Sequence, residues 1–381
     1  MRKRRRIKKW PLITLVLLIC LVFGALHFFK DYFKKVKEDN TPEIIEKEVD
    51  REKEYNVSFT LGGNVLINSN MWKDTKKEET YDFTSIFEYL NDIMKKSDIN
   101  YYTQQSIVGG KDLGVSVSYN YNTPETLIDT LSNIGFNMAS LASVHSYDKK
   151  ETGITNAIKT MGNKGFTFSG IKDTKDGVTN NIVTKNGLKI GILSYAKKTD
   201  EVIPTDNSYM VSIYSDELAK KKVEELKKKT DIILVAIDFS DVNANTVSEE
   251  QKRIANYLSD LGVNIVVGNT GYSIQPIEII NNTLVCYSLG NLLSGHTSID
   301  SRISAMVDFN LKITKKTEET KYTFGDVNVL LTYAYNNGAG QKYKVVPFTK
   351  ITNELNNYKT YYEKYDKLLS KENITLYAIG D

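Results

Sequence analysis

Beyond Tyr55 the chain alternates short apolar, β-branched runs with longer segments whose apolar residues recur at helical spacing. Residues two apart share one face of a strand, and residues three or four apart share one face of a helix, so the spacing separates the two elements. Because apolar strands that alternate with helices pack as layers, the pattern predicts an α/β sandwich. It places strands at 57–66, 98–108, 136–142, 166–171, 181–187, 188–196, 231–239 and 263–271, and helices at 82–97, 123–135, 153–165, 215–229 and 248–262.

Several of these elements carry recognisable end signals. Thr123-Pro124 opens one helix and Gly135 closes it, as expected for a cap, a first-turn proline and a left-handed terminal residue. Ser248 and Gln251 form a Ser-x-x-Gln capping box. Asn186-Gly187 between two strands predicts a tight hairpin. The polar segment 314–326 is predicted to be an exposed loop or hairpin.

The N-terminus carries seven Lys or Arg among its first nine residues, followed by an apolar run over 11–29. A run of about 20 apolar residues is long enough to cross a bilayer as a helix. A cleaved signal peptide would have a shorter apolar core and a small-residue exit, whereas here large residues follow Gly24-Ala25. The pattern favours a basic cytoplasmic segment at 1–9 and a retained anchor at 10–29, with the remainder outside the membrane.

The rest of the chain divides by composition. Residues 30–55 are charged and are predicted to be a stalk, with a short helix opened by Thr41-Pro42. Residues 56–351 form the predicted folded domain, and 352–381 a helical extension at the C-terminus. With one cysteine in the anchor (Cys20) and one beyond it (Cys286), the exported part has no pair for a disulfide, so burial must stabilise it.

Composition changes this picture little. A 41% hydrophobic fraction and 25% charged residues are typical of a chain with packed cores. The 50 basic and 47 acidic side chains leave a formal charge of only +3, and nucleic-acid binding needs a concentrated positive face. We therefore expect no nucleic-acid partner.

Polar residues follow the predicted strands at five points, where functional groups of such sandwiches gather. Gly62-Gly63 and Gly290 are expected to permit tight turns or close backbone approach, and Asn291 to bond a neighbouring loop. The five points are Gly62-Gly63-Asn64, Thr103-Gln104-Gln105, Ser143-Val144-His145, Asp238-Phe239-Ser240-Asp241 and Asn269-Thr270-Gly271-Tyr272.

Two segments resemble the CapA family of capsule and poly-γ-glutamate synthesis proteins, which has the calcineurin-like metallophosphatase fold. "GVNIVVGNTGYSIQPIEIINNTLVCYSLGN" is similar to the family's Gly-x-His-Pro-His-x-x-Gln-Pro-x-Glu run and its Tyr-Ser-Leu-Gly-Asn element. "TPETLIDTLSNIGFNMASLASVHSYDKKETGI" is similar to the helix that leads to Ala-Asn-Asn-His. The resemblance spans about 57–351 and implies a metallophosphatase-like α/β/β/α sandwich after one transmembrane helix.

The chain departs from the family where the resemblance implies metal ligands and catalytic groups. Asn64 stands in place of Asp, and Gln105 in place of Glu. Ser143-Val144-His145 replaces Asn-Asn-His, and the segment 238–241 replaces the His-x-Gly-x-Glu element. The family's paired histidines align with Asn269 or Thr270 and with Tyr272. Because amides and hydroxyls are weak ligands for transition metals, we expect no metal and no other cofactor.

Other chemistry remains conceivable among the remaining carboxylates. Asp98, Asp148, Asp238 and Asp241 are candidates for a rebuilt site, and the last two could hold a hard cation such as Ca²⁺. Ser143 or Ser146 with His145 and Asp148 could form a Ser-His-Asp arrangement, although neighbours on one segment rarely face each other correctly. His145, Asp148, Asp238 and Asp241 are thus vestigial cleft candidates, and the candidate binding residues are Asn64, Gln105, Ser143, Asn269, Tyr272 and Asn291.

The resemblance implies a single-pass membrane protein with an extracytoplasmic domain, lacking catalysis, that binds or scaffolds in surface-polymer synthesis. Its expected partners are the membrane, a polymer synthase complex and an anionic polymer. One alternative is a metal-dependent hydrolase with rebuilt ligands. Another is an envelope interaction module unrelated to capsule, with stacking contacts from an exposed groove of Tyr101, Tyr102, Tyr147 and Tyr272.

Overall fold

The computed structural model of the chain describes residues 10–39, 52–117, 119–177, 180–240, 245–269, 272–317 and 319–379. These fall into two compact units, one within Met1–Arg51 and one comprising Glu52–Asp381. The predicted basic segment 1–9 and the predicted helix at Thr41-Pro42 lie outside the described residues.

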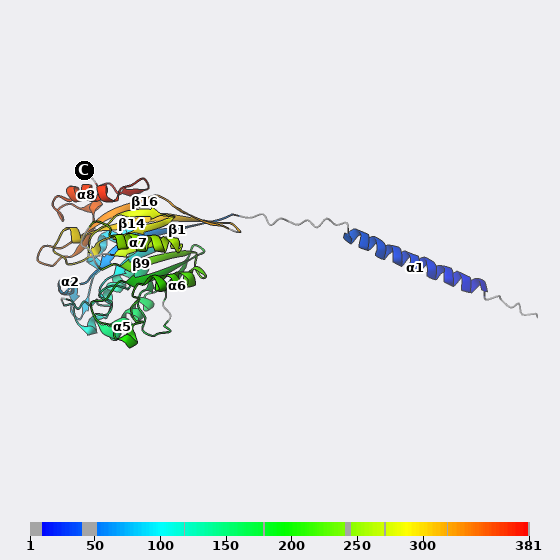
Figure 1. The fold of residues 1–381 in the computed structure, drawn as a ribbon, viewed down its shortest axis with the longest axis horizontal. Coiled ribbons are helices and arrows are strands. Elements are labelled where there is room, and N and C mark those ends of the chain that lie inside the picture. The colour runs from blue at the N-terminus through cyan, green and yellow to red at the C-terminus, as the bar shows by residue number, and fades with distance from the viewer. Residues whose placement is uncertain are drawn as a thin grey trace, which may run out of the picture. The chain divides into compact units, whose positions relative to one another are not determined.

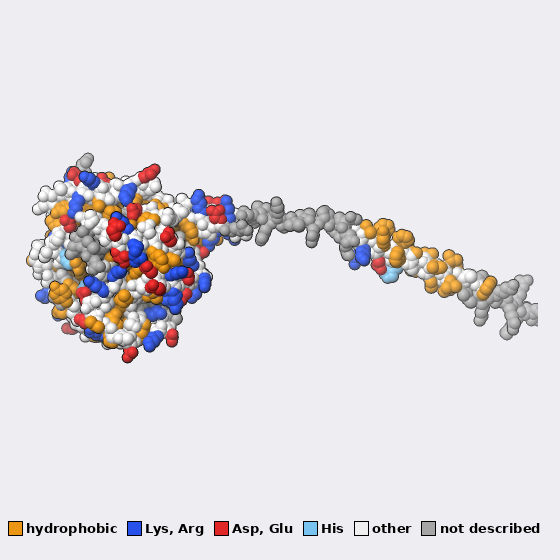
Figure 2. Space-filling model, viewed as in Figure 1, with side chains coloured by type: hydrophobic (Ala, Val, Ile, Leu, Met, Phe, Trp, Pro, Cys, Tyr) orange, Lys and Arg blue, Asp and Glu red, His pale blue; other side chains and the backbone are white. Residues whose placement is uncertain are grey.

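The described residues of the first unit form one helix, α1 (Trp10–Asp39). Its segment Thr14–Val36 is long and apolar enough to cross a membrane, and the described side chains of that segment are exposed. Figure 2 shows groups of hydrophobic side chains along the length of the helix, interspersed with other side chains. Apolar surface on this scale is unfavourable in water, so its composition fits a lipid environment.

The second unit is built on two large β-sheets (Figure 1). Within the described residues, the first sheet has ten strands, seven of them in one continuous order. That order is β17 (Lys344–Pro347), β16 (Val327–Tyr335), β14 (Ile303–Lys315), β1 (Lys53–Val65), β4 (Ile99–Gln104), β5 (Met138–Ser140) and β6 (Thr167–Ser169). The other three are β13 (Asn291–Leu293) on β1, β15 (Thr320–Phe324) on β14 and β18 (Ile374–Leu376) on β16.

The second sheet has six strands among the described residues, and its central members are parallel. Its buried strands are continuous apolar runs, as expected for parallel strands covered on both faces. Their order is β11 (Ile277–Ile280), β12 (Thr283–Cys286), β10 (Ile265–Asn269), β9 (Ile232–Asp238), β8 (Leu188–Ala196) and β7 (Ile182–Lys185). A separate two-stranded hairpin joins β2 (Lys76–Lys77) to β3 (Thr80–Tyr81).

Three hydrophobic cores define four layers. One core lies between the sheets, where Phe59 and Leu61 of β1 and Ile190 and Ile192 of β8 belong to a single cluster. A second core packs the first sheet against α2 (Ser69–Thr75), α3 (Asn91–Met94), α4 (Thr126–Ile134) and α5 (Lys150–Asn163). A third packs the second sheet against α6 (Asp216–Lys227) and α7 (Glu249–Asp260). The predicted α/β/β/α sandwich is confirmed.

Most end signals read from the sequence are confirmed, but Thr123-Pro124 does not open α4, whose N-cap is Glu125 and whose first residue is Thr126. Gly135 ends α4 in the left-handed conformation at φ 116°. Ser248 and Gln251 bond reciprocally as a capping box at the start of α7. Asn186 and Gly187 both have positive φ between β7 and β8, as a tight hairpin of this kind requires. The segment 314–326 forms the β14–β15 hairpin.

The prediction of one helix over 82–97 is wrong. The segment instead forms two 3-10 turns, η1 (Thr84–Ile86) and η2 (Glu88–Leu90), followed by the single-turn α3. Asp82 Oδ1 accepts the Thr84 backbone N–H at 2.9 Å, which competes with helix formation at that end. Phe83, Phe87 and Met94 are all buried, so packing rather than helical regularity sets the path of this segment.

The C-terminal residues complete the first sheet. Helix α8 (Tyr358–Leu369) buries Tyr365 and Leu369 in the core between the sheets. The strand β18 that follows pairs in parallel with β16. The remaining short helical turns are η3 (Lys111–Leu113), η4 (Thr205–Asn207), η5 (Asp300–Arg302) and η6 (Phe348–Lys350).

Candidate functional site

A continuous chain of contacts joins the polar strand ends of both sheets. Asn64 of β1 is in register with Asn291 of β13, and its Nδ2 donates to Asn291 Oδ1 at 3.2 Å. Beyond β4, the Gln105 carbonyl accepts the Ser143 hydroxyl at 2.6 Å. We call Asn64, Gln105, Ser143, His145, Asp148, Asp238, Asn269, Tyr272 and Asn291 the strand-end cluster.

The two sheets meet within this cluster. Asp238 Oδ2, at the end of β9 in the second sheet, accepts the Val144 backbone N–H at 3.0 Å. Asp238 is also in register with Asn269 of β10, and the next residue, Phe239, donates its N–H to the Asn269 carbonyl at 2.7 Å. The polar groups after β4 and β5 therefore face those after β9 and β10, as the strand-end argument predicts.

Glycines allow this convergence of backbones. A Cβ atom on Gly63 would lie 2.2 Å from the Gly290 carbonyl oxygen, and Gly290 itself has φ of +70°. The Asn291 side chain donates to the Ser301 carbonyl at 2.8 Å. The expected duties of these residues, close approach and bonding of a neighbouring loop, are confirmed.

The turn Ser140–Asp148 is held by its own serines. Ser146 Oγ donates to the Leu141 carbonyl at 2.6 Å and accepts the Ser143 backbone N–H at 2.7 Å. The His145 N–H in turn donates to Ser143 Oγ at 3.1 Å. Both serine hydroxyls are thus engaged by the backbone, and neither is oriented on the imidazole as a nucleophile would be.

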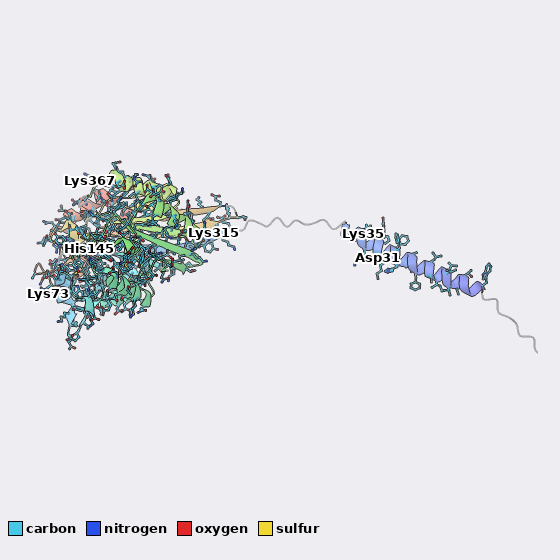
Figure 3. All side chains as sticks on the ribbon, turned by 60° about the horizontal axis from the view of Figure 1, so that its bottom comes forward. Asp31, Lys35, Lys73, His145, Lys315 and Lys367 are labelled. Atoms are coloured by element: carbon cyan, nitrogen blue, oxygen red, sulfur yellow. The ribbon has the colours of Figure 1, made fainter. Side chains whose placement is uncertain are left out.

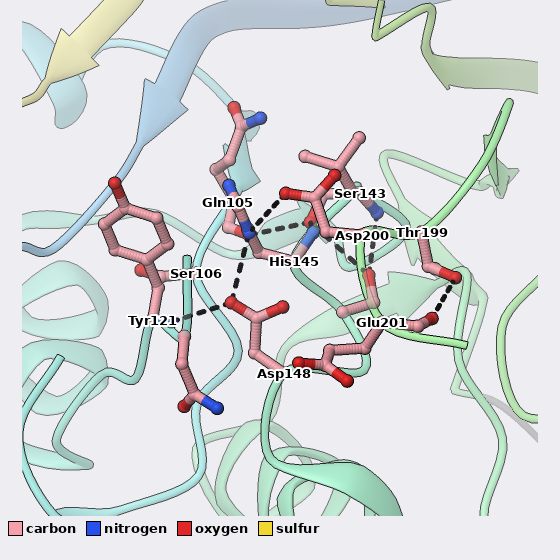
Figure 4. Close-up of polar contacts among 12 residues, drawn as sticks. Gln105, Ser106, Tyr121, Ser143, His145, Asp148, Thr199, Asp200 and Glu201 are labelled. Atoms are coloured by element: carbon pink, nitrogen blue, oxygen red, sulfur yellow. Dashed lines mark hydrogen bonds and ion pairs between the residues drawn. The ribbon is translucent and has the colours of Figure 1, made fainter. Parts of the chain in front are cut away.

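His145 lies inside the folded unit, only 4% exposed (Figure 3). Its Nδ1 lies 3.1 Å from Asp148 Oδ2 and 3.6 Å from Asp200 Oδ2 (Figure 4). Asp148 Oδ2 also accepts the Tyr121 backbone N–H at 2.7 Å, and the Tyr121 ring meets the imidazole edge to face at 4.5 Å. Two carboxylates and one ring therefore surround His145, and among the described residues its Nδ1 forms no hydrogen bond.

Asp238 is a buried connector between the sheets. Besides the Val144 N–H, its carboxylate accepts the Ser240 N–H at 3.0 Å. Burial raises the pKa of Asp238 to about 6, although these N–H donors oppose the shift. Its oxygens are already committed to backbone donors, which leaves them poorly placed to bind a cation.

Tyr272 lies at the border of the cluster, beside a second histidine, His296. Its ring centroid is 3.9 Å from that of His296. Burial raises the pKa of Tyr272 to about 12, and the nearby Tyr121, Asp238 and Asp200 add to the shift. Burial also lowers the pKa of His296. Tyr272 therefore lies among the groups that surround His145.

Some predicted residues are placed elsewhere. Asp98 lies directly before β4 and beside Ser58 of β1, and its Oδ2 accepts both the N–H and the hydroxyl of Ser58 at 2.9 and 2.8 Å. It is therefore not part of the strand-end cluster. Asp241 and the pair Thr270-Gly271 lie outside the described residues, so the suggested Asp238–Asp241 cation site is not described.

The prediction of an exposed tyrosine groove is wrong. Tyr101, Tyr102 and Tyr147 are each at most 1% exposed. Neighbours on a strand point to opposite faces, so Tyr101 enters the core between the sheets while Tyr102 enters the core beneath the helices. Of the four tyrosines, only Tyr272 is partly exposed.

Sequence reasoning missed Tyr121, Asp200 and His296. Asp200 lies in the polar segment Lys197–Asp200, which directly follows β8. This segment is a sixth polar strand end, and the argument that selected the other five applies to it equally. Tyr121 and His296 lie in irregular segments, where periodicity carries no signal.

Comparison with known proteins identifies the family. The family model described as "Bacterial capsule synthesis protein PGA_cap" matches residues 58–296, more than half of the chain. This chain belongs to the PGA_cap family.

Curated relatives agree with the PGA_cap assignment and with the resemblance to CapA. The PGA biosynthesis protein CapA of Bacillus subtilis is 24% identical over 67% of this chain and 68% of its own length. The capsule biosynthesis protein CapA of Bacillus anthracis is 22% identical over 67% of this chain and 64% of its own length. The chain thus spans about two thirds of each relative, and the predicted CapA membership is confirmed.

Solved structures give more distant similarities. A putative 5'-nucleotidase from Staphylococcus aureus aligns with a TM-score of 0.43 and 12% identity, over 81% of this chain and 58% of that one. The Thermus thermophilus protein TT1561 aligns with a TM-score of 0.38 and 10% identity, over 66% of this chain and 93% of that one.

Within this PGA_cap member, the residues at the strand ends do not fit a divalent metal pair. Such a pair needs several anionic or imidazole donors converging within about 4 Å. In the described part of the chain, no group of three or more His, Cys, Asp or Glu side chains is placed to hold a metal ion. Asn64, Gln105 and Asn269 offer amides where carboxylates or imidazoles would be required. The cluster offers amide, hydroxyl and carboxylate groups for hydrogen bonds, and eight of its nine side chains are buried.

Proposed function

We propose that this chain is a membrane-anchored, extracytoplasmic component of capsule synthesis that binds or scaffolds without metal-dependent catalysis. The observation that carries the proposal is the strand-end cluster, which brings amide and hydroxyl groups together at the positions where the resemblance implies metal ligands. Asp238, one of its two buried carboxylates, accepts the N–H groups of Val144 and Ser240. Structural duties of this kind survive when catalysis is lost.

Anchoring through α1 is supported by its length and composition. The segment Thr14–Val36 has a mean hydropathy of 1.8, and seven of the first nine residues are basic. Basic residues favour the cytoplasmic side, so we expect the N-terminus inside and the folded unit outside. The proposed polymer is of the poly-γ-glutamate type because one relative is named for PGA biosynthesis and another for capsule biosynthesis.

The metal content of the purified protein tests the absence of a metal centre. The full chain is extracted in detergent, dialysed without chelator and analysed for Mn, Fe and Zn by mass spectrometry. We expect far less than one equivalent of each, because the described residues present no ligand group. Stoichiometric metal that persists through dialysis would support the alternative of a hydrolase with rebuilt ligands.

Complementation tests the absence of catalysis. In the native bacterium, the gene is deleted and restored as wild type or as His145→Ala, and surface polymer is quantified. A scaffold should restore polymer to near the wild-type level in both cases, with protein abundance checked by immunoblot. A variant that is present at normal abundance yet makes no polymer would contradict the non-catalytic role. Polymer that is unaffected by deletion itself would redirect the protein to another envelope pathway.

A further inference from the structure

A cavity of about 220 Å³ opens beside the second sheet and shares no residue with the strand-end cluster. It lies between the segment that follows β6, the edge of β8 and helix α6. Ligand sites for drug-sized molecules are usually larger, about 300–1,000 Å³. The cavity is therefore suited to one small unit rather than to a large cofactor.

The cavity lies where β8 extends beyond the end of β7, its neighbouring strand. Strand β7 pairs with β8 only as far as Ile182 opposite Gly191. Beyond that point, Ile192 donates its N–H to the Asn181 carbonyl and Ala196 donates its N–H to the Ser212 carbonyl, at 2.9 and 3.0 Å. The open stretch of edge between these two bonds carries Ser194 and Tyr195, and both line the cavity.

Two buried hydroxyls in this wall lack hydrogen-bond partners. Ser194 is 1% exposed and Tyr195 is 2% exposed, and neither hydroxyl has a partner among the described residues. Buried polar groups are nearly always satisfied, and leaving one unpaired costs free energy. Burial also raises the pKa of Tyr195, so its hydroxyl stays protonated and can donate.

The charges around the cavity favour an anion. Lys172, Lys222 and Lys229 line it together with a single carboxylate, Glu225. Lys222 Nζ pairs with Glu225 Oε2 at 2.7 Å. Within the described residues, neither Lys172 nor Lys229 forms an ion pair, so the lining keeps a net positive charge.

We propose that this cavity binds the carboxylate of one small acidic unit, with the Tyr195 hydroxyl as donor and Lys172 as counter-charge. Tyr195 packs in the core beside α6, whereas its strand neighbour Ser194 points to the opposite face of β8. A carboxylate can accept the tyrosine hydroxyl on one oxygen and pair with the ammonium through the other. Glu225 in the same wall disfavours a doubly charged phosphate more than a singly charged carboxylate. The choice of a glutamate-based probe rests on the proposed function, whereas the preference for a carboxylate rests on the cavity.

The test uses the full chain in detergent and a short γ-linked glutamate oligomer, titrated by calorimetry. Removing one hydrogen bond to a charged group should weaken binding roughly tenfold in Tyr195→Phe. The same variant should unfold at an equal or higher temperature, because it loses a buried hydroxyl without a partner. Lys172→Ala should also weaken binding, whereas Lys185→Ala on β7, outside the cavity, should leave it unchanged.

Several outcomes would overturn the proposal. Unchanged affinity in both Tyr195→Phe and Lys172→Ala would show that the oligomer binds elsewhere or not at all. Tighter binding of inorganic phosphate than of the oligomer would overturn the carboxylate assignment. If the protein bound equally well an oligomer whose carboxylates are converted to amides, the carboxylate assignment would also be overturned. Bound metal, or loss of polymer in His145→Ala, would count against the proposed function without bearing on this cavity.

Discussion

At the scale of single residues, four of the nine members of the strand-end cluster bond backbone groups through their side chains: Ser143, Asp148, Asp238 and Asn291. Ser143 and Ser146 satisfy the carbonyls of Gln105 and Leu141, and Asp238 joins the sheets through the Val144 N–H. Since these bonds are buried, each would be costly to leave unmade. The backbone around His145 is therefore held by hydrogen bonds that do not depend on any catalytic activity.

The buried carboxyl of Asp238 should make stability depend on pH. Its folded pKa of about 6 lies above the value of 3.8 for an exposed group, so the folded state binds the proton more tightly. The free energy of unfolding should fall as the pH rises from about 4 to about 6 and then level off, by at most about 3 kcal/mol. Thermal unfolding of the full chain between pH 4 and pH 7 measures this slope.

The variants Asp238→Asn and Asp176→Asn provide the comparison. The side chain in Asp238→Asn cannot ionise. The free energy of unfolding of this variant should therefore lack the fall between pH 4 and pH 6 that Asp238 causes, even if its absolute stability differs from that of the wild type. Asp176 is exposed, and Asp176→Asn should retain the wild-type slope. Parallel pH profiles for the wild type and Asp238→Asn would show that Asp238 does not titrate as described.

At the scale of elements, close approaches of backbone within each sheet depend on glycine. β1 passes so close to the segment before β13 that a Cβ on Gly63 would overlap the Gly290 carbonyl, and Gly268 of β10 has a similar contact with the Tyr287 carbonyl. These approaches involve backbone on both sides, which cannot move aside as a flexible side chain can. The observed spacing between these backbone segments therefore requires glycine at Gly63 and Gly268.

Gly63→Ala should destabilise the folded unit by about 1–3 kcal/mol, because overpacking against fixed backbone costs about this much. Gly162→Ala is the matched control, since Gly162 lies within α5 with no heavy atom within 4 Å of the added Cβ. That change should stabilise the protein by about 0.5–1 kcal/mol. Chemical denaturation of both variants measures the two shifts, and equal shifts would contradict the close approach.

At the scale of the whole molecule, the two units have opposite surfaces. The folded unit presents positive and negative side chains intermingled over the visible face (Figure 2), as suits an aqueous environment. Helix α1 instead exposes Leu17, Leu18 and Leu21, each more than half exposed. A single chain with both kinds of surface is suited to a membrane boundary.

Replacing both Leu17 and Leu18 by Arg should abolish membrane retention, because each charge at the centre of a spanning helix costs about 2.5–3.5 kcal/mol. The measurement is the fraction of full chain that sediments with membranes after an alkaline carbonate wash. The double change to Ile keeps the helix apolar and should be retained like the wild type. Retention of the Arg variant would contradict anchoring through α1.

The sequence determined most of the local structure. Apolar spacing, the capping box at Ser248 and the Asn186-Gly187 turn each act through residues a few positions apart, so they can be read along the chain. The prediction from apolar spacing was wrong over 82–97. Phe83, Phe87 and Met94 are buried there, and their packing determines the path of the backbone. Local signals predict elements well only when packing does not override them.

Only the tertiary structure decided which groups meet. It brings Asp200 and Tyr121, distant in sequence from each other, to opposite sides of His145, and it buries Tyr101 and Tyr102 on opposite faces of one sheet. It also opens the edge of β8 at Ser194 and Tyr195. Contacts of this kind depend on how strands are ordered and where each one stops, and this order is set by the burial of whole layers rather than by any neighbouring residues.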